Sequence, residues 1–197
     1  MQVAIGFKSH SGWAVAVVVG VDGTRLRLVD RRRVTLIEPG DSPWAKAPYH
    51  AAEDLPAKEG DALVERARRS AASGSKRTVR ELVEAMRAAS HDVAACAVLR
   101  PSKPLPPWTT REILAVHFRM HQAEGAMFPA ALERAVDASG VRLASIVEKT
   151  LTGTAERAIG RAPAALIADL GRGAGPPWGA DQKNAALAAI VALKARR

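Results

Sequence analysis

The sequence predicts an α/β protein built on a five-stranded mixed sheet flanked by helices. Three β-rich runs follow one another within the first 37 residues, and two further apolar runs, 93–99 and 141–147, alternate with segments of helical periodicity. The predicted order is a three-strand antiparallel meander followed by α-β-α-β-α. With 197 residues, 48% hydrophobic and 25% charged, the chain has the length and balance of one folded domain, and we expect residues 1–197 to form it.

The meander comprises residues 2–8, 12–20 and 24–37, which are rich in valine, isoleucine and leucine. Only short polar breaks separate the runs. The second break contains Asp22-Gly23, and Asp-Gly after a β-branched run is typical of a hairpin turn. Consecutive strands joined by such short turns must run antiparallel.

The middle of the chain predicts a loop, two helices and a buried strand. Residues 38–58 show no periodicity, so we expect a long surface loop there. Helical patterns over 59–72 and 78–90 are interrupted by Ser73-Gly74-Ser75, and Thr78 with Glu81 resembles the capping box that begins a helix. Run 93–99 is too short and too uniformly apolar for a surface helix, which favours a buried parallel strand.

The second half continues the alternation of helix and strand. Thr109 and Glu112 form a capping-box pattern ahead of a helix expected to reach residue 139. Residues 141–147 form the fifth strand, short helices follow it, and a final helix covers 181–197. Because βαβ crossovers are right-handed, we expect strands one, four and five to be adjacent and parallel.

The amino-acid composition favours some classes of protein function and argues against others. The formal net charge is +9, and most of the 29 basic residues are arginines, whose planar guanidinium groups suit phosphate. This balance favours a polyanionic partner, DNA or RNA, while an aromatic content of 4% argues against a base-stacking platform. A single cysteine excludes a disulfide framework. Neither a membrane span nor a secretory signal is evident, so we expect a cytoplasmic protein without a membrane partner.

Four segments follow one another in order along the chain: VAIGFKSHSGWAVAVV, HQAEGAMFPAALERA, EKTLTG and DQKNAALAAIVAL. Together with the order of elements, which is that of the ribonuclease-H-like fold, they resemble the RuvC-type Holliday-junction resolvases. The first segment is similar to the first hairpin of that family, and the later three resemble its central helix, the segment after its fifth strand and its terminal helix.

The resemblance implies a site of four carboxylates that hold two divalent metal ions for phosphodiester cleavage. At the matching positions this sequence has Lys8 at the end of strand one and Leu99, followed by Arg100, at the end of strand four. On the terminal helix it has Asp181 and Asn184. A protonated lysine offers no lone pair to a metal ion, so we expect a degraded metal site.

Several polar residues are candidates for this degraded site. Asp181 and Asn184 are three apart on an apolar helix stripe, and either they are the remnant of a site or they are a capping Asp and a hydrogen-bonded Asn. Glu148 follows strand five and is either a carboxylate of the cleft or a solvated loop residue. The catalytic candidates are therefore Asp181, Asn184, Lys8 and Glu148.

The cluster Lys8-Ser9-His10-Ser11 follows the first strand. Lys8 either forms an ion pair with Asp181 or contacts a phosphate; the alternative is a plain polar turn. The full set of nucleic-acid-binding candidates is Lys8, Ser9, His10, Arg25, Arg27, Arg31, Arg32, Arg33 and Arg100. Three arginine-rich groups along the chain either share a binding face or are separate solvated faces.

His117 and His121 are spaced i, i+4 on one helix, with Glu124 following. That spacing can bind zinc, but HFRMH lacks the glutamate of HExxH and shows no third ligand, so no metal site is predicted.

The leading hypothesis is a RuvC-like protein with a degraded metal site, acting as a nucleic-acid-binding or scaffold module without nuclease activity. The first alternative is a metal-dependent nuclease with an altered acid set: Asp181, Glu148 and Glu38. The second is a protein-interaction domain of a larger assembly. Under the leading hypothesis we expect no cofactor. Under the first alternative we expect Mg²⁺. A homodimer or a protein partner is compatible with all three hypotheses.

Overall fold

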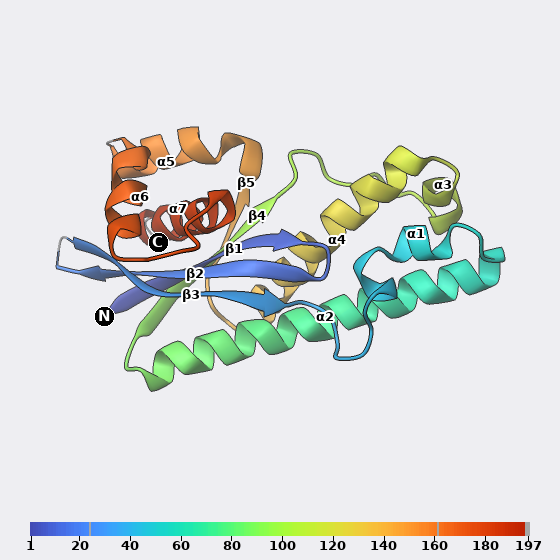
Figure 1. Cartoon of the computed structure of the whole chain (residues 1–197), viewed down its shortest axis with the longest axis horizontal. Coiled ribbons are helices and arrows are strands. Elements are labelled where there is room, and N and C mark those ends of the chain that lie inside the picture. Colours follow the sequence, from blue (N-terminus) through green and yellow to red (C-terminus); the bar gives the residue numbers. More distant parts are fainter. Residues whose placement is uncertain (24, 161, 196–197) are drawn as a thin grey trace.

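The computed structural model describes residues 1–23, 25–160 and 162–195 and has the predicted mixed sheet at its centre (Figure 1). The sheet order is β3-β2-β1-β4-β5, so β1 is the middle strand. β1 pairs antiparallel with β2 and parallel with β4, and β5 extends the parallel part. These pairings confirm the predicted strand order. The strands are β1 Gln2–His10, β2 Trp13–Asp22, β3 Arg25–Thr35, β4 Asp92–Arg100 and β5 Leu143–Val147.

Helices cover both faces of the sheet. The long helices α2 and α4 pack on one face, whereas α5, α6 and α7 pack on the other, each group with its own hydrophobic cluster (Figure 1). The helices are η1 Trp44–Lys46, α1 Pro48–Ala52, α2 Ala57–Ala88, α3 Thr110–Leu114, α4 His117–Ala138, η2 Glu148–Thr150, α5 Leu151–Ile159, α6 Pro163–Arg172 and α7 Ala180–Lys194.

The alternation of side chains along β1 decides which residues face α7. Ile5 and Phe7 belong to the cluster under α2 and α4, whereas Ala4 belongs to the cluster under α7. Gly6 also faces α7, and a Cβ atom added there would lie 1.9 Å from the backbone oxygen of Ala185. The helix therefore lies directly on β1. By the same alternation, Lys8 is on the α7 face of the sheet.

The two helices predicted over 59–72 and 78–90 are one helix, α2, of 32 residues. The small residues that suggested a break lie where the helix crosses the end of β3. Gly74 is buried there, and a Cβ atom would lie 2.5 Å from the carbonyl carbon of Leu36. Thr78 does not cap a helix, because its hydroxyl donates to the carbonyl oxygen of Thr35 at 2.7 Å.

The surface loop predicted over 38–58 is partly wrong, because this segment contains η1 and α1. The Tyr49 side chain on α1 is 2% exposed and packs with residues of α2, α3 and α4 in a third, smaller cluster. Sequence periodicity missed α1 because one short turn of helix is too brief to show a repeat.

The remaining elements follow the predictions closely. Thr109 and Glu112 form the expected capping box, but the helix that it begins is the short α3. Residues 115–116 are not helical and separate α3 from α4. The final helix begins at Ala180; the last two residues of the range 181–197 predicted for it lie outside the described residues. Within the described ranges, none of the helices combines the length and apolar character needed to cross a membrane.

Candidate functional site

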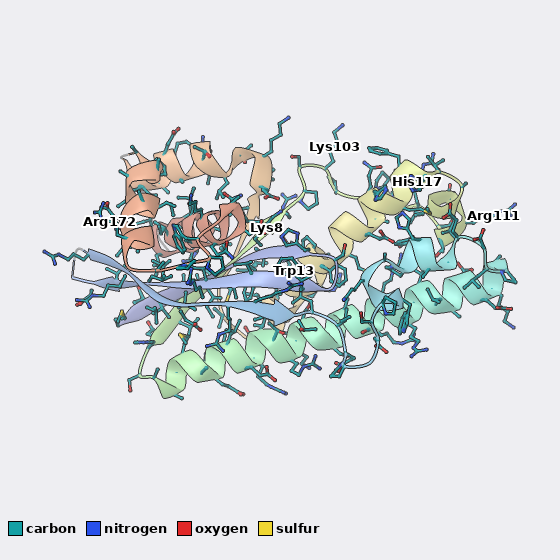
Figure 2. The ribbon with its side chains drawn as sticks, viewed as in Figure 1. Lys8, Trp13, Lys103, Arg111, His117 and Arg172 are labelled. Atoms are coloured by element: carbon teal, nitrogen blue, oxygen red, sulfur yellow. The ribbon has the colours of Figure 1, made fainter. Side chains whose placement is uncertain are left out.

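The candidate site lies on the α7 face of the sheet, at the end of β1. Lys8 and His10 are both on this face, two residues apart, beyond the close contact between Gly6 and α7. Asp181 stands in the first turn of α7, and Glu148 begins η2 directly after β5. Figure 2 shows Lys8 and Trp13 toward the same end of the sheet. Three separate parts of the chain therefore supply polar groups to this edge.

Lys8 forms an ion pair with Glu148. Lys8 Nζ donates to Glu148 Oε2 at 2.6 Å, and the two side chains are 19% and 37% exposed. Leu99, on the intervening strand β4, is 2% exposed and belongs to the cluster under α7. The pair therefore spans from β1 to the end of β5 beside an apolar residue, which limits its access to water.

Asp181 pairs with His10. The distance between His10 Nε2 and Asp181 Oδ2 is 2.9 Å, and both side chains are 34% exposed. The imidazole also stacks on the Trp13 indole, with ring centroids 4.3 Å apart and planes 15° from parallel. On this indole lies the Arg33 guanidinium, 3.8 Å from the ring centroid. His10, Trp13 and Arg33 thus form a continuous stack that starts at Asp181.

The predicted ion pair between Lys8 and Asp181 is wrong: none is present among the described residues. His10, two residues further along β1, pairs with Asp181, whereas the Lys8 side chain extends toward Glu148 at the end of β5. Asn184 is half-buried, and its side chain makes no hydrogen bond within the described parts of the chain. Asp181 is not the helix cap either, since α7 is capped at Gly179, whose N–H donates to Gln182 Oε1 at 3.0 Å.

The two carboxylates at this edge, those of Glu148 and Asp181, each pair with a basic side chain. Glu148 accepts from Lys8 and Asp181 from His10, and among the described residues no set of three metal-ligating side chains converges at this edge. Glu38, the third acid of the altered set, pairs with Arg77 of α2 on the opposite face. The three acids of that set therefore do not come together.

A groove of about 430 Å³ lies between the β2–β3 hairpin and the start of α7. Its lining includes Trp13, Arg31, Arg33 and Asp181. Arg31 holds the segment 175–177, which precedes α7, against β3. Its guanidinium donates to the carbonyl oxygens of Gly175 at 2.9 Å and Pro176 at 2.8 Å, and also to that of Pro177. The groove is thus framed by arginines and one tryptophan, a combination suited to phosphate and to planar groups.

The other predicted binding residues are distributed over both faces. Arg25 is exposed on β3, Arg27 pairs with Asp22 at 2.9 Å, and Arg32 pairs with Asp30. Ser9 is opposite Ala14, which belongs to the cluster under α2 and α4, so Ser9 points away from Lys8.

Arg100 lies apart from the groove. It lines a separate cavity of about 510 Å³ together with Arg68, Lys103 and Arg134. The predicted residues therefore do not form one patch. The contribution of Trp13 was missed, although its position three residues after His10, across a short turn, is a signal for such a stack.

The central β1, its antiparallel partners β2 and β3, and the parallel strands β4 and β5 define a ribonuclease-H-like fold. Two solved structures of RuvC from Thermus thermophilus share it. One, in complex with a Holliday junction substrate, has a TM-score of 0.52 and 14% identity, covering 97% of this chain and 92% of that chain. The other also has a TM-score of 0.52, with 16% identity, covering 96% and 92%. No family model matches the chain, and no curated protein sequence matches it.

Proposed function

We propose that this protein is a RuvC-like nucleic-acid-binding module, or a scaffold, whose metal site is degraded and which does not cleave nucleic acid. The observation that carries the proposal is the ion pair between Lys8 and Glu148 at 2.6 Å. Two-metal hydrolysis needs several carboxylates around a pair of cations. An ammonium group at the end of β1 repels such cations and uses one of the two nearby acids.

Binding through the groove is supported by its charge and its shape. Arg33 lies over Trp13, and among the described residues no carboxylate pairs with its guanidinium. A phosphate can therefore take the outer side of this group without breaking an ion pair. The chain carries a net charge of +9, which adds a long-range attraction for polyanions. One of the structures with this fold contains a Holliday junction, so branched DNA is the first ligand to test.

The experiment combines cleavage and binding on the same purified protein. Four-way-junction and duplex DNA are incubated with Mg²⁺ or Mn²⁺, and we expect no product. Binding is then measured by fluorescence anisotropy over a range of salt concentrations. We expect weak, salt-sensitive binding, with a log–log slope of about 0.9 for each phosphate neutralised on duplex DNA.

Two variants of equal charge locate the binding surface. Arg33→Ala should weaken binding and lower the salt slope by about 0.9, because one phosphate contact is lost. Arg80→Ala removes an exposed arginine from α2, on the other face of the sheet, and should leave affinity within about twofold. Equal losses in the two variants would mean that nucleic acid does not use the groove.

A nuclease with an altered acid set is the second candidate, because Glu148 and Asp181 both pair with residues near the end of β1. Robust metal-dependent cutting that disappears in Asp181→Ala would replace the leading proposal with this one. If no nucleic acid binds even at low ionic strength, the protein-interaction function takes its place.

A further inference from the structure

Three histidines meet at the end of the molecule formed by α1, α3 and the start of α4, far from α5 and α6 (Figures 1 and 2). They are His50 from α1 and the pair His117 and His121 from the first turns of α4. One ligand nitrogen from each lies within 4.8 Å of the others. The fold thus supplies the third ligand that the i, i+4 pair lacks in the sequence.

The rings surround a common point rather than stacking into a column. The centroids of His117 and His121 are 4.7 Å apart with planes at 88°. The His50 ring lies 5.2 Å from His117 at 89° and 4.7 Å from His121 at 55°. Steeply inclined rings whose nitrogens converge are the arrangement in which three imidazoles coordinate one ion.

Glu124 fixes the ring of His50. This carboxylate is 7% exposed and accepts from the backbone N–H groups of Tyr49 and His50 at 3.1 and 3.3 Å. The distance between its Oε2 and His50 Nδ1 is 2.9 Å. A carboxylate at Nδ1 favours the tautomer with its proton there, which leaves the Nε2 lone pair free. A buried carboxylate behind a histidine is the support that metal-bound imidazoles usually have.

We propose that His50, His117 and His121 bind one zinc-class transition-metal ion, with Glu124 as the positioning residue for His50. Zn–N bonds of about 2.0–2.1 Å in tetrahedral geometry place ligand nitrogens roughly 3.4 Å apart. His117 and His121 are exposed, so their side chains can turn inward by the remaining distance. Imidazole ligands select Zn²⁺, Ni²⁺ or Cu²⁺ over Mg²⁺, and the solvent-facing side leaves a fourth position for water.

The bound ion would join α1 to α4. The segment between β3 and α2 is held against α4 by the small cluster around Tyr49 and by Glu124. A metal bridge adds a third attachment at its surface. This site is independent of the groove at α7, and neither proposal depends on the other.

Zn²⁺ binding is measured by titration against a chromophoric chelator, with Mg²⁺ in excess. We expect one Zn²⁺ per chain and a higher melting temperature with Zn²⁺. His117→Ala and His121→Ala should each weaken Zn²⁺ affinity by at least about 100-fold, and because both side chains are exposed the variants should fold. His91→Ala changes a histidine directly before β4 and outside the cluster; it is the control and should bind as the parent does.

Glu124→Gln tests the positioning role. Glutamine can still accept from the two backbone N–H groups, but its amide is a weaker partner for the imidazole, and we expect a 10- to 100-fold loss of affinity. Circular dichroism verifies the fold of each variant. Absence of stoichiometric Zn²⁺ binding in the parent, or equal binding by the parent, His117→Ala and His121→Ala, would overturn the proposal.

Discussion

Lys8 is the charged residue that β1 contributes to the candidate site. Its side chain is 19% exposed and is on the same face as the buried Leu99, so its charge needs a partner within the protein. Glu148 supplies that charge from the far side of β4. The same pairing removes the one carboxylate that the end of β5 offers to a cation. At this edge two acids each have a basic partner: Glu148 pairs with Lys8 and Asp181 with His10.

A double-mutant cycle measures the energy of this pair. We expect Lys8→Met and Glu148→Gln to be coupled by about 1–2 kcal/mol, between the values for exposed and buried pairs, because the pair is only partly shielded from water. The readout is the free energy of unfolding from urea titrations.

The exposed pair Arg27–Asp22, at 60% and 55%, is the control for this cycle and should couple by less than about 1 kcal/mol. Additive effects at Lys8 and Glu148 would show that the contact contributes nothing to stability, and the carboxylate would then be free for a ligand.

Some residues could be placed from the sequence and others could not. Cys96 belongs to the run 93–99, for which the sequence predicts a buried strand, and it is buried; desolvation raises the pKa of its thiol to about 12. Lys8 was expected at the end of the first strand and lies two residues before the end of β1, which continues to His10; its partner was not predicted. That partner depends on how far η2 and α7 project over the sheet, which no local pattern encodes. His50 was missed for the same reason, since only the packing of α1 on α4 brings it to His117.

At the scale of elements, the Ser73-Gly74-Ser75 run in α2 is explained by the close approach of the helix to a neighbouring backbone segment rather than by helix propensity. The Ser-Gly-Ser run in α2 resembles a break, because glycine and serine are poor helix formers. In the fold it marks the place where α2 crosses the backbone of Leu36 and Ile37, and only a residue without a side chain fits. Strands were easier to predict, because each apolar run is several times longer than the two-residue repeat of a β-strand. The order of the strands in the sheet is also restricted by the crossover rule.

Two glycine substitutions in helix interiors separate packing from propensity. Gly74→Ala should destabilise the protein by roughly 2–4 kcal/mol, because the new Cβ atom would lie 2.5 Å from backbone atoms that cannot move without shifting β3 or α2. Gly125→Ala, in α4, meets no atom within 4 Å and should stabilise by about 0.5–1 kcal/mol. Urea unfolding gives both values. A neutral Gly74→Ala would mean that α2 and β3 are less tightly packed than described.

At the scale of the whole molecule, the buried hydrophobic residues of the described ranges form three clusters of unequal size. Two cover the opposite faces of the sheet and include residues of β1 and β4. The third, around Tyr49, joins α1 and α3 to the starts of α2 and α4 without any strand residue. The groove lies at the sheet, whereas the three histidines lie at the end of the molecule that contains the third cluster. The molecule thus has a large central body and a smaller helical end.

Hydrogen exchange should resolve these two parts. Amides of α1 and α3 are in helices of five residues over the smallest cluster, so we expect them to exchange through local opening, well before those of β1 and β4. Zn²⁺ should slow exchange in α1 and the first turns of α4 and leave β1 unchanged, because the proposed ion ties only those helices.

The His121→Ala variant serves as the control for the exchange experiment. It keeps the Tyr49 cluster but loses a metal ligand, so Zn²⁺ should have no effect on its exchange, while the early opening of α1 and α3 remains. These two results separate the opening of the helical end from metal binding. If α1 and β1 exchange with the same opening free energy without Zn²⁺, the prediction of early opening is wrong and the helical end unfolds together with the sheet. If α1 opens first, the helical end is a separate cooperative unit, and the third cluster alone is too small to hold it to the sheet.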